Sequence, residues 1–240
     1  ERQGEAMHRY VLGLYRILEE ITEKHPQVLF CGCSGGGGRY DPAMLYYQPE
    51  IWCSDNTDAV NRLKIQYGTS FAYPVNTMEA HVSVCPNHQT GRSVSLKTRG
   101  GVAMDGVLGY ELDSRKLSEE EKAFCRKQVE FYKAHYRLIA EGDYYRLSNP
   151  YENPRYTAWQ HVSKDRRESL VSLVLTDKEG NAGQLYVKLK GLDPDAWYEV
   201  EGKEGRYSGA LFMNAGIPVP ASLGEYESIQ FVLRTVQEKK

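Results

Sequence analysis

The sequence contains no long apolar run, no large charge of one sign and no signal-peptide pattern. None of its apolar stretches approaches the roughly 18 residues of a membrane-spanning helix. The formal net charge is −2, which gives no reason to expect nucleic acid as a partner. We therefore expect neither a membrane nor a nucleic acid among its partners. The chain begins Glu1-Arg2-Gln3 without an initiator methionine, and we expect a fragment or a processed chain.

Motifs of the common metal and nucleotide sites are also missing. The five cysteines include no C-x-x-C pair, and no H-E-x-x-H is present, so no metal is expected. Four consecutive glycines at positions 35–38 are not followed by Gly-Lys-Ser/Thr, which excludes a Walker loop, and no cofactor is expected. Cys31, Cys53 and Cys85 lie in apolar runs, as free thiols do, and this predicts a cytoplasmic protein.

The amino-acid composition is typical of a globular protein. The chain has 240 residues, of which 41% are hydrophobic and 26% charged, enough for one large domain or two smaller ones. Strands and helices alternate through the first 140 residues, which predicts parallel βαβ units and half of a (β/α)8 TIM barrel. The predicted helices span 5–24, 57–67 and 118–141, with one or two helical turns at 42–47, and the predicted strands span 28–33, 51–53, 68–73 and 101–104.

The pattern changes near Gly142 to short β-rich segments. The predicted strands span 145–147, 157–162, 169–175, 184–188, 198–200 and 229–233. Residues 177–181 and 201–205 have the composition of hairpin turns. The expected fold class is therefore α/β: the barrel half in residues 1–146, followed by an antiparallel β-sandwich in residues 147–240.

Polar residues follow two predicted strands about twenty residues apart. The glycines at 35–38 follow the first, and Ser-Asp-Asn-Thr-Asp at 54–58 follows the second. In parallel α/β proteins, ligands bind where strands end. Asp55 either points into such a cleft or caps the following helix, and spacing alone favours the cap.

The neighbouring candidates leave alternatives open. Arg39 fits either an anion site or a buried structural ion pair. Trp52 fits either a sugar-stacking platform or core packing. Cys33 as a thiol nucleophile would need a histidine base, for which His81 and His88 are candidates, although His81 better fits a hydrogen-bonded barrel residue.

Four blocks resemble the family 36 glycoside hydrolases, the microbial α-galactosidases. They are GCSGGGGRYD at 32–41, WCSDNTDA at 52–59, RLKIQYGTS at 62–70 and HVSVCPNHQ at 81–89. The resemblance extends from about Gly4 to Thr235 and implies a (β/α)8 barrel followed by a C-terminal antiparallel β domain. It also implies a retaining mechanism with two aspartates, acting on terminal α-galactosides such as melibiose and raffinose.

The resemblance assigns roles to particular residues. Asp55 would be the general acid/base, and Cys33, Gly36, Gly38 and Arg39 would help to hold the galactose. Trp52 is a further substrate-binding candidate, from its place next to Asp55 and not from the resemblance. The family's nucleophile lies in a Lys-x-Asp motif on an earlier strand, and no such motif precedes Asp55. The chain thus resembles the C-terminal part of such an enzyme, with the N-terminal part and a second copy of the enzyme as expected partners. A galactosyl transferase of the raffinose or stachyose synthase type and a non-catalytic sugar-binding fragment are the alternatives.

Overall fold

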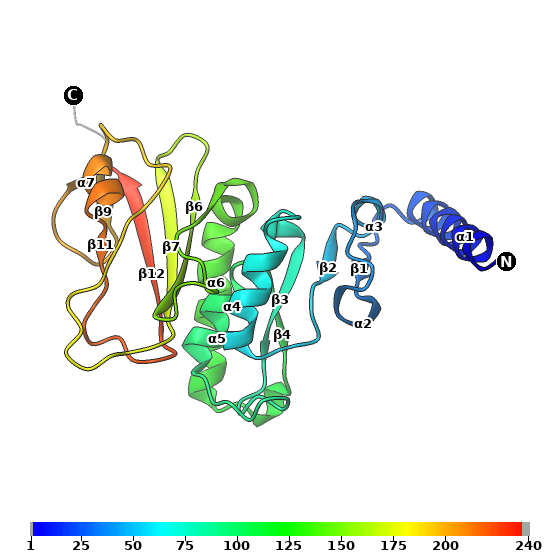
Figure 1. Cartoon of the computed structure of the whole chain (residues 1–240), viewed down its shortest axis with the longest axis horizontal. Coiled ribbons are helices and arrows are strands. Elements are labelled where there is room, and N and C mark those ends of the chain that lie inside the picture. The colour runs from blue at the N-terminus through cyan, green and yellow to red at the C-terminus, as the bar shows by residue number, and fades with distance from the viewer. Residues whose placement is uncertain (1, 237–240) are drawn as a thin grey trace. The chain divides into compact units, whose positions relative to one another are not determined.

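A computed structural model describes residues 2–236 (Figure 1). The described chain divides into two compact units, one up to Asp55 and one from Asn56 onward. No helix among the described residues has both the length and the apolar character needed to cross a membrane.

The first unit contains five short elements around a parallel strand pair. In chain order they are α1 (Gln3–Lys24), β1 (Cys31–Gly32), the helical turn α2 (Ser34–Gly37), α3 (Pro42–Tyr47) and β2 (Glu50–Trp52). β1 and β2 pair in parallel, with Gly32 opposite Ile51. The unit is held together by the buried side chains of Leu18, Met44 and Ile51, one from each of α1, α3 and β2.

The second unit begins with helices and parallel strands. They are α4 (Ala59–Thr69), the 3-10 turn η1 (Val75–Thr77), β3 (Met78–Ser83), α5 (Leu96–Ala103), β4 (Val107–Glu111), the 3-10 turn η2 (Ser114–Lys116) and α6 (Glu119–Glu141). β3 pairs in parallel with β4. Ser118 and Glu121 form a capping box that starts α6, as the Ser-Glu-Glu-Glu sequence predicts.

An antiparallel sheet in the order β10-β9-β12-β7-β6-β5 forms the rest of the second unit. Its strands are β5 (Asp143–Arg146), β6 (Tyr156–Val162), β7 (Glu168–Leu175), β9 (Trp197–Val200), β10 (Tyr207–Ser208) and β12 (Ser228–Thr235). A second layer holds the strand pair β8 (Tyr186–Val187) and β11 (Ile217–Pro218) with α7 (Gly209–Asn214). The parallel pairs and the antiparallel sheets confirm the predicted fold class.

Both faces of this sheet are covered, which explains why β6 and β7 are buried almost throughout, polar residues such as Gln160 and Ser172 included. Alternate residues of β6 point to opposite sides: Trp159 packs with Leu63 of α4, whereas Ala158 packs in the sandwich core with Phe212 of α7. Helix α6 lies beside the same sheet (Figure 1), and its Leu138 packs with Leu170 of β7 and Val232 of β12. Each aliphatic side chain buried in such a core contributes about 1.5–3 kcal/mol.

A buried polar cluster lies where the helices meet the sheet. Asp105, which follows α5, accepts a hydrogen bond from Tyr144 of β5 at 3.2 Å. His161 of β6 places Nε2 3.5 Å from Oδ1 of Asp105, and both side chains are fully buried. Burial raises the pKa of the Asp105 carboxyl, and the nearby His161 and Tyr144 only partly oppose this.

Two predicted strands of the first 140 residues are wrong. Residues 68–73 end α4 and form a turn, and the strand follows as β3. Residues 101–104 belong to the end of α5, which Ser95 caps, and the strand follows as β4. In α5 a Cβ on Gly100 would overlap the side-chain amide of Gln128, so glycine, despite its low helix propensity, lets Gln128 pack closely against this helix.

The two predicted hairpin turns have opposite outcomes. Residues 201–205 join β9 to β10, which pair antiparallel, so this hairpin is confirmed. Residues 177–181 do not make a hairpin, because the strand that follows, β8, pairs with β11, while β7 pairs with β6 and β12. The first strand is also shorter than predicted, covering Cys31–Gly32 rather than residues 28–33.

Candidate active site

The glycine-rich segment after β1 forms a turn of left-handed backbone. Ser34, Gly35, Gly36 and Gly37 have φ values of 58°, 65°, 75° and 91°. For residues with a Cβ this conformation costs about 1–2 kcal/mol each, whereas glycine adopts it freely. The run of glycines is therefore what allows the chain to reverse directly after Cys33.

This turn packs directly against the end of β2. A Cβ on Gly36 would lie 2.6 Å from the backbone nitrogen of Asp55 and 3.0 Å from its Cγ. A Cβ on Gly37 would lie 2.9 Å from the carbonyl oxygen of Cys53. Both distances are too short for a real Cβ, so the two strand ends meet only because these residues are glycine. The structure thus brings the two polar segments together, as the sequence predicts.

Asp55 is exposed and its carboxyl accepts a hydrogen bond from a neighbouring indole. Nε1 of Trp52 donates to Oδ1 of Asp55 at 3.0 Å. Trp52 itself is only 8% exposed, so the sugar-stacking alternative has little ring surface available, and its hydrogen bond to Asp55 goes beyond core packing. In the sequence, the spacing of three residues between Trp52 and Asp55 is the feature that could have predicted this hydrogen bond.

Asp55 is not the helix cap that its position favours. The N-cap of α4 is Asp58, whose carboxylate accepts hydrogen bonds from the backbone N–H groups of Val60 and Asn61. The guanidinium of Arg92 forms an ion pair with Oδ1 of Asp58 at 2.5 Å, and the hydroxyl of Thr90 donates to Oδ2 at 2.6 Å. The prediction that Asp55 caps the helix is therefore wrong.

Arg39 and Cys33 are both exposed in the first unit. The guanidinium of Arg39 donates to the Tyr10 hydroxyl at 2.6 Å and lies 5.8 Å from the centre of that ring. It is therefore not a buried ion pair, and the anion-site alternative remains. No pattern in the sequence predicted this hydrogen bond to Tyr10 of α1, which lies 29 residues away along the chain. Gly38 belongs to the same turn, where its N–H donates to the carbonyl of Ser34.

The other candidates lie in the second unit. His81 is on β3, with Nδ1 3.7 Å from a carboxylate oxygen of Glu111, and its ring fills the space beside Gly109. His88 follows β3 in the loop before α5. Among residues 2–236, no three His, Cys, Asp or Glu side chains are grouped as metal ligands.

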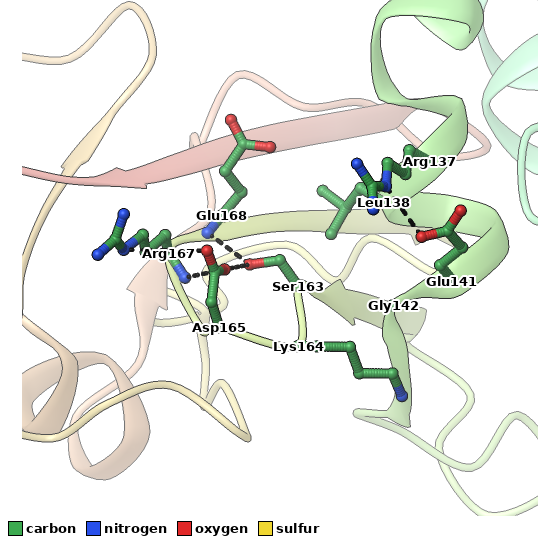
Figure 2. A pocket seen from close by; sticks show the side chains of 9 residues that line it. All are labelled: Arg137, Leu138, Glu141, Gly142, Ser163, Lys164, Asp165, Arg167 and Glu168. Carbon is green, nitrogen blue, oxygen red and sulfur yellow. Dashed lines mark hydrogen bonds and ion pairs between the residues drawn. The ribbon is translucent and has the colours of Figure 1, made fainter.

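A cavity of about 530 Å³ in the second unit has a different character (Figure 2). Its lining is mostly charged, and Arg137 pairs with Glu141 and Arg167 with Asp165. No aromatic side chain lines it; the residues are Arg137, Leu138, Glu141, Gly142, Ser163, Lys164, Asp165, Arg167 and Glu168. Because sugar sites combine aromatic faces with hydrogen-bonding groups, this cavity does not compete with the Asp55 site.

The family profile described as "Melibiase" matches residues 1–142, and the profile "Glycosyl hydrolase family 36 C-terminal domain" matches residues 156–233. The chain belongs to the melibiase family. Its relatives in this family are α-galactosidases. The chain is 54% identical over 238 residues to α-galactosidase AgaA of Geobacillus stearothermophilus, which is 99% of this chain and 32% of that protein. It is 52% identical to the bifunctional α-galactosidase/sucrose kinase AgaSK of Mediterraneibacter gnavus, over 98% of this chain and 25% of that protein.

Solved family 36 structures have the same fold over nearly the whole chain. The structure of AgaB from Geobacillus stearothermophilus superposes with a TM-score of 0.94 at 54% identity, covering 98% of this chain and 32% of that one. An α-galactosidase from Lactobacillus brevis covers 100% of this chain and 33% of its own, with a TM-score of 0.96 at 41% identity. An AgaA variant was solved in complex with raffinose and another with stachyose. The chain spans about a third of the length of the curated relatives it matches.

Proposed function

We propose that these residues form the acid/base half of the active site of a retaining α-galactosidase that hydrolyses melibiose- and raffinose-type substrates. The observation that carries the proposal is the contact of the glycine turn with Asp55, which places an exposed carboxyl beside a small-residue surface. Family membership and the sugars named in the relatives' structures support the substrate class. Cys33, Gly36, Gly38 and Arg39 are proposed to hold the galactose.

The proposed mechanism is a double displacement. A nucleophilic aspartate, proposed to lie on another segment of a longer polypeptide about 5–5.5 Å from Asp55, attacks the anomeric carbon. Asp55 gives its proton to the leaving oxygen as the glycosidic bond breaks. Asp55 then takes a proton from water, whose oxygen bonds to the anomeric carbon and displaces the nucleophile. The domain division at residues 146 and 147 is part of the proposal.

Asp55→Ala tests this role in a complete enzyme. A suitable one is a chimera, here called the AgaA chimera, in which these 240 residues replace the matching third of AgaA. General acid catalysis contributes about 10²–10⁴-fold, and poor leaving groups need it most. We expect the variant to lose far more activity on melibiose than on a nitrophenyl α-galactoside. Azide, which needs no base, should restore turnover and give α-galactosyl azide. Equal losses on both substrates without an azide effect would refute the role.

The galactosyl transferase alternative shares this chemistry and differs in the acceptor. With a nitrophenyl α-galactoside as donor and sucrose as acceptor, both enzymes release nitrophenol, but a hydrolase transfers the galactosyl group to water and gives galactose, whereas a transferase transfers it to sucrose and gives raffinose. Product analysis of the AgaA chimera therefore separates the two. The non-catalytic alternative predicts that the chimera binds galactose without turnover.

A further inference from the structure

Tyr10 is held in place by the helix that carries it. It lies on α1 four residues before Leu14, which lies four residues before Leu18, so the three side chains share one face of the helix. Leu18 is buried in one cluster with Met44 and Ile51, and Leu14 packs against that cluster. The exposed Tyr10 therefore continues the packed face of α1 beyond the core, and the packing of α1 sets its position.

The hydroxyl of Tyr10 binds the guanidinium of Arg39, which directly follows the glycine turn. Nη2 of Arg39 donates to this hydroxyl at 2.6 Å, and Cζ lies 5.8 Å from the centre of the Tyr10 ring. An unrestrained arginine side chain has many rotamers, but its guanidinium is a rigid, planar fork of N–H donors. One anchored N–H therefore restricts the whole group, while the other N–H groups stay available to a ligand.

The anchor of Arg39 is a neutral hydroxyl and not a carboxylate. Among residues 2–236, no ion pair links Arg39 to an acidic side chain. Asp41, two residues later, uses its carboxylate to cap α3, where it accepts from the N–H groups of Ala43 and Met44. A carboxylate partner would compensate the charge of the guanidinium, whereas a hydroxyl leaves that charge to strengthen a hydrogen bond to a ligand oxygen. Tyr10 thus restrains the arginine without neutralising it.

We propose that Tyr10 is a positioning residue for sugar binding, which holds the Arg39 guanidinium in the orientation that donates to the galactose hydroxyls. The inference rests on the proposed role of Arg39 in holding the galactose. Those hydroxyls keep their hydrogen bonds while the glycosidic bond breaks, so the contact stabilises the bound substrate and the transition state alike. Loss of such an interaction raises KM and leaves kcat unchanged. Tyr10 therefore controls sugar affinity and not the chemical step.

The test removes only the hydroxyl of Tyr10. In the AgaA chimera, Tyr10→Phe keeps the aromatic ring, but the N–H of Arg39 loses its acceptor. The rotamer freedom that one flexible side chain then has to give up on binding corresponds to an affinity about 3- to 10-fold weaker. KM for melibiose and the inhibition constant of galactose should both rise about 3- to 10-fold, and kcat should stay the same.

Tyr47→Phe is the matched control. Tyr47 of α3 donates its hydroxyl to Glu19 of α1 at 2.7 Å, so this variant also removes one tyrosine hydrogen bond that joins α1 to another element of the first unit. It leaves Tyr10 and Arg39 in place. We expect the two variants to have similar melting temperatures and only Tyr10→Phe to bind galactose more weakly. An equal rise of the inhibition constant in both would show that α1 is loosened as a whole, which would overturn the positioning role.

A double-mutant cycle with Arg39→Gln shows whether Tyr10 acts through Arg39. Arg39→Gln should weaken galactose binding by itself, and Tyr10→Phe should add nothing in that background. An undiminished effect of Tyr10→Phe without Arg39 would overturn the proposal. So would an unchanged inhibition constant in Tyr10→Phe, or a lower kcat at constant galactose affinity.

Failure of the proposed function would look different from these results. If Arg39→Gln alone left galactose affinity unchanged, Arg39 would not hold the sugar, and the positioning role would end with it. Equal losses for Asp55→Ala on both substrates would refute the acid/base role and leave the affinity measurements on Tyr10 and Arg39 valid, because inhibition by galactose needs no proton transfer.

Discussion

Replacing Gly36 by alanine tests whether the contact between the glycine turn and Asp55 matters for catalysis. The new Cβ would lie 2.6 Å from the backbone nitrogen of Asp55, whereas ordinary contact begins at 3.4 Å. Either the turn or Asp55 must therefore move by about 0.8 Å. Gly35 provides a matched control, because its φ of 65° imposes the same backbone strain while a Cβ there would touch nothing within 4 Å.

The two variants should differ in activity and not in backbone strain. The left-handed conformation costs an alanine about 1–2 kcal/mol of folding free energy at either position. Only the Gly36 variant also displaces the carboxyl, and a shift near 1 Å can cost about 10²-fold in rate. For Gly36→Ala we expect kcat on melibiose to fall about 10- to 100-fold, and for Gly35→Ala we expect little change.

Steady-state kinetics on the AgaA chimera and urea unfolding of each variant provide the comparison. The expected result is a large difference in kcat, together with a lower stability of Gly36→Ala than of Gly35→Ala, because only the Gly36 variant adds a steric clash to the backbone strain. If Gly35→Ala and Gly36→Ala lose activity equally, strain of the turn explains both losses, and the contact with Asp55 has no catalytic importance. If neither loses activity, the packing of Gly36 against Asp55 is not needed at all.

Two other predictions concern the chain itself. Residues 1–240 alone should not hydrolyse an aryl α-galactoside, since no Lys-x-Asp motif supplies the proposed nucleophile; turnover by the pure chain would refute this. The raised pKa of Asp105 means that its contribution to stability is full below the unfolded pKa near 3.8 and is lost as pH rises through the folded pKa. Asp105→Asn should therefore flatten this loss of stability with rising pH in urea unfolding measured against pH; an unchanged slope would exclude Asp105 as its cause. The groups that face Asp105 stay constant in the comparison: Gln66 and Tyr67 of α4, Tyr144 of β5 and His161 of β6. The guanidinium of Arg146 lies over the Tyr144 ring and is likewise unchanged.

Local signals predicted the elements whose ends are set by nearby residues. The Ser118 capping box fixes the start of α6, and the apolar spacing of α1 gives a helix within two residues of the predicted start. The strand predicted at residues 101–104 failed because its glycines serve contacts far along the chain. Gly100 faces Gln128 of α6, and Gly101 faces Ser228 of β12. Such contacts override local propensity and leave no mark within a short window.

The candidate site was predictable in composition but not in geometry. Four blocks of sequence indicated the glycine turn and the aspartate segment together, and the structure brings Gly36 into contact with Asp55. The partner of Arg39 is Tyr10, which the helical periodicity assigns simply to an apolar face. A side chain that serves both packing and hydrogen bonding gives only the packing signal in a sequence.

The two aspartates of the Ser-Asp-Asn-Thr-Asp segment show how position divides chemistry between identical residues. Asp58 is 1% exposed; burial raises its pKa, but hydrogen bonds from Thr90 and the Asn61 N–H, with the charge of Arg92, outweigh burial and lower it. A carboxyl held in its ionised form by four hydrogen bonds has no proton to give and cannot reorient without uncapping α4. Asp55, which is exposed and accepts a hydrogen bond from Trp52 through Oδ1, is therefore the member of the pair that we propose exchanges a proton with a sugar oxygen and then with water.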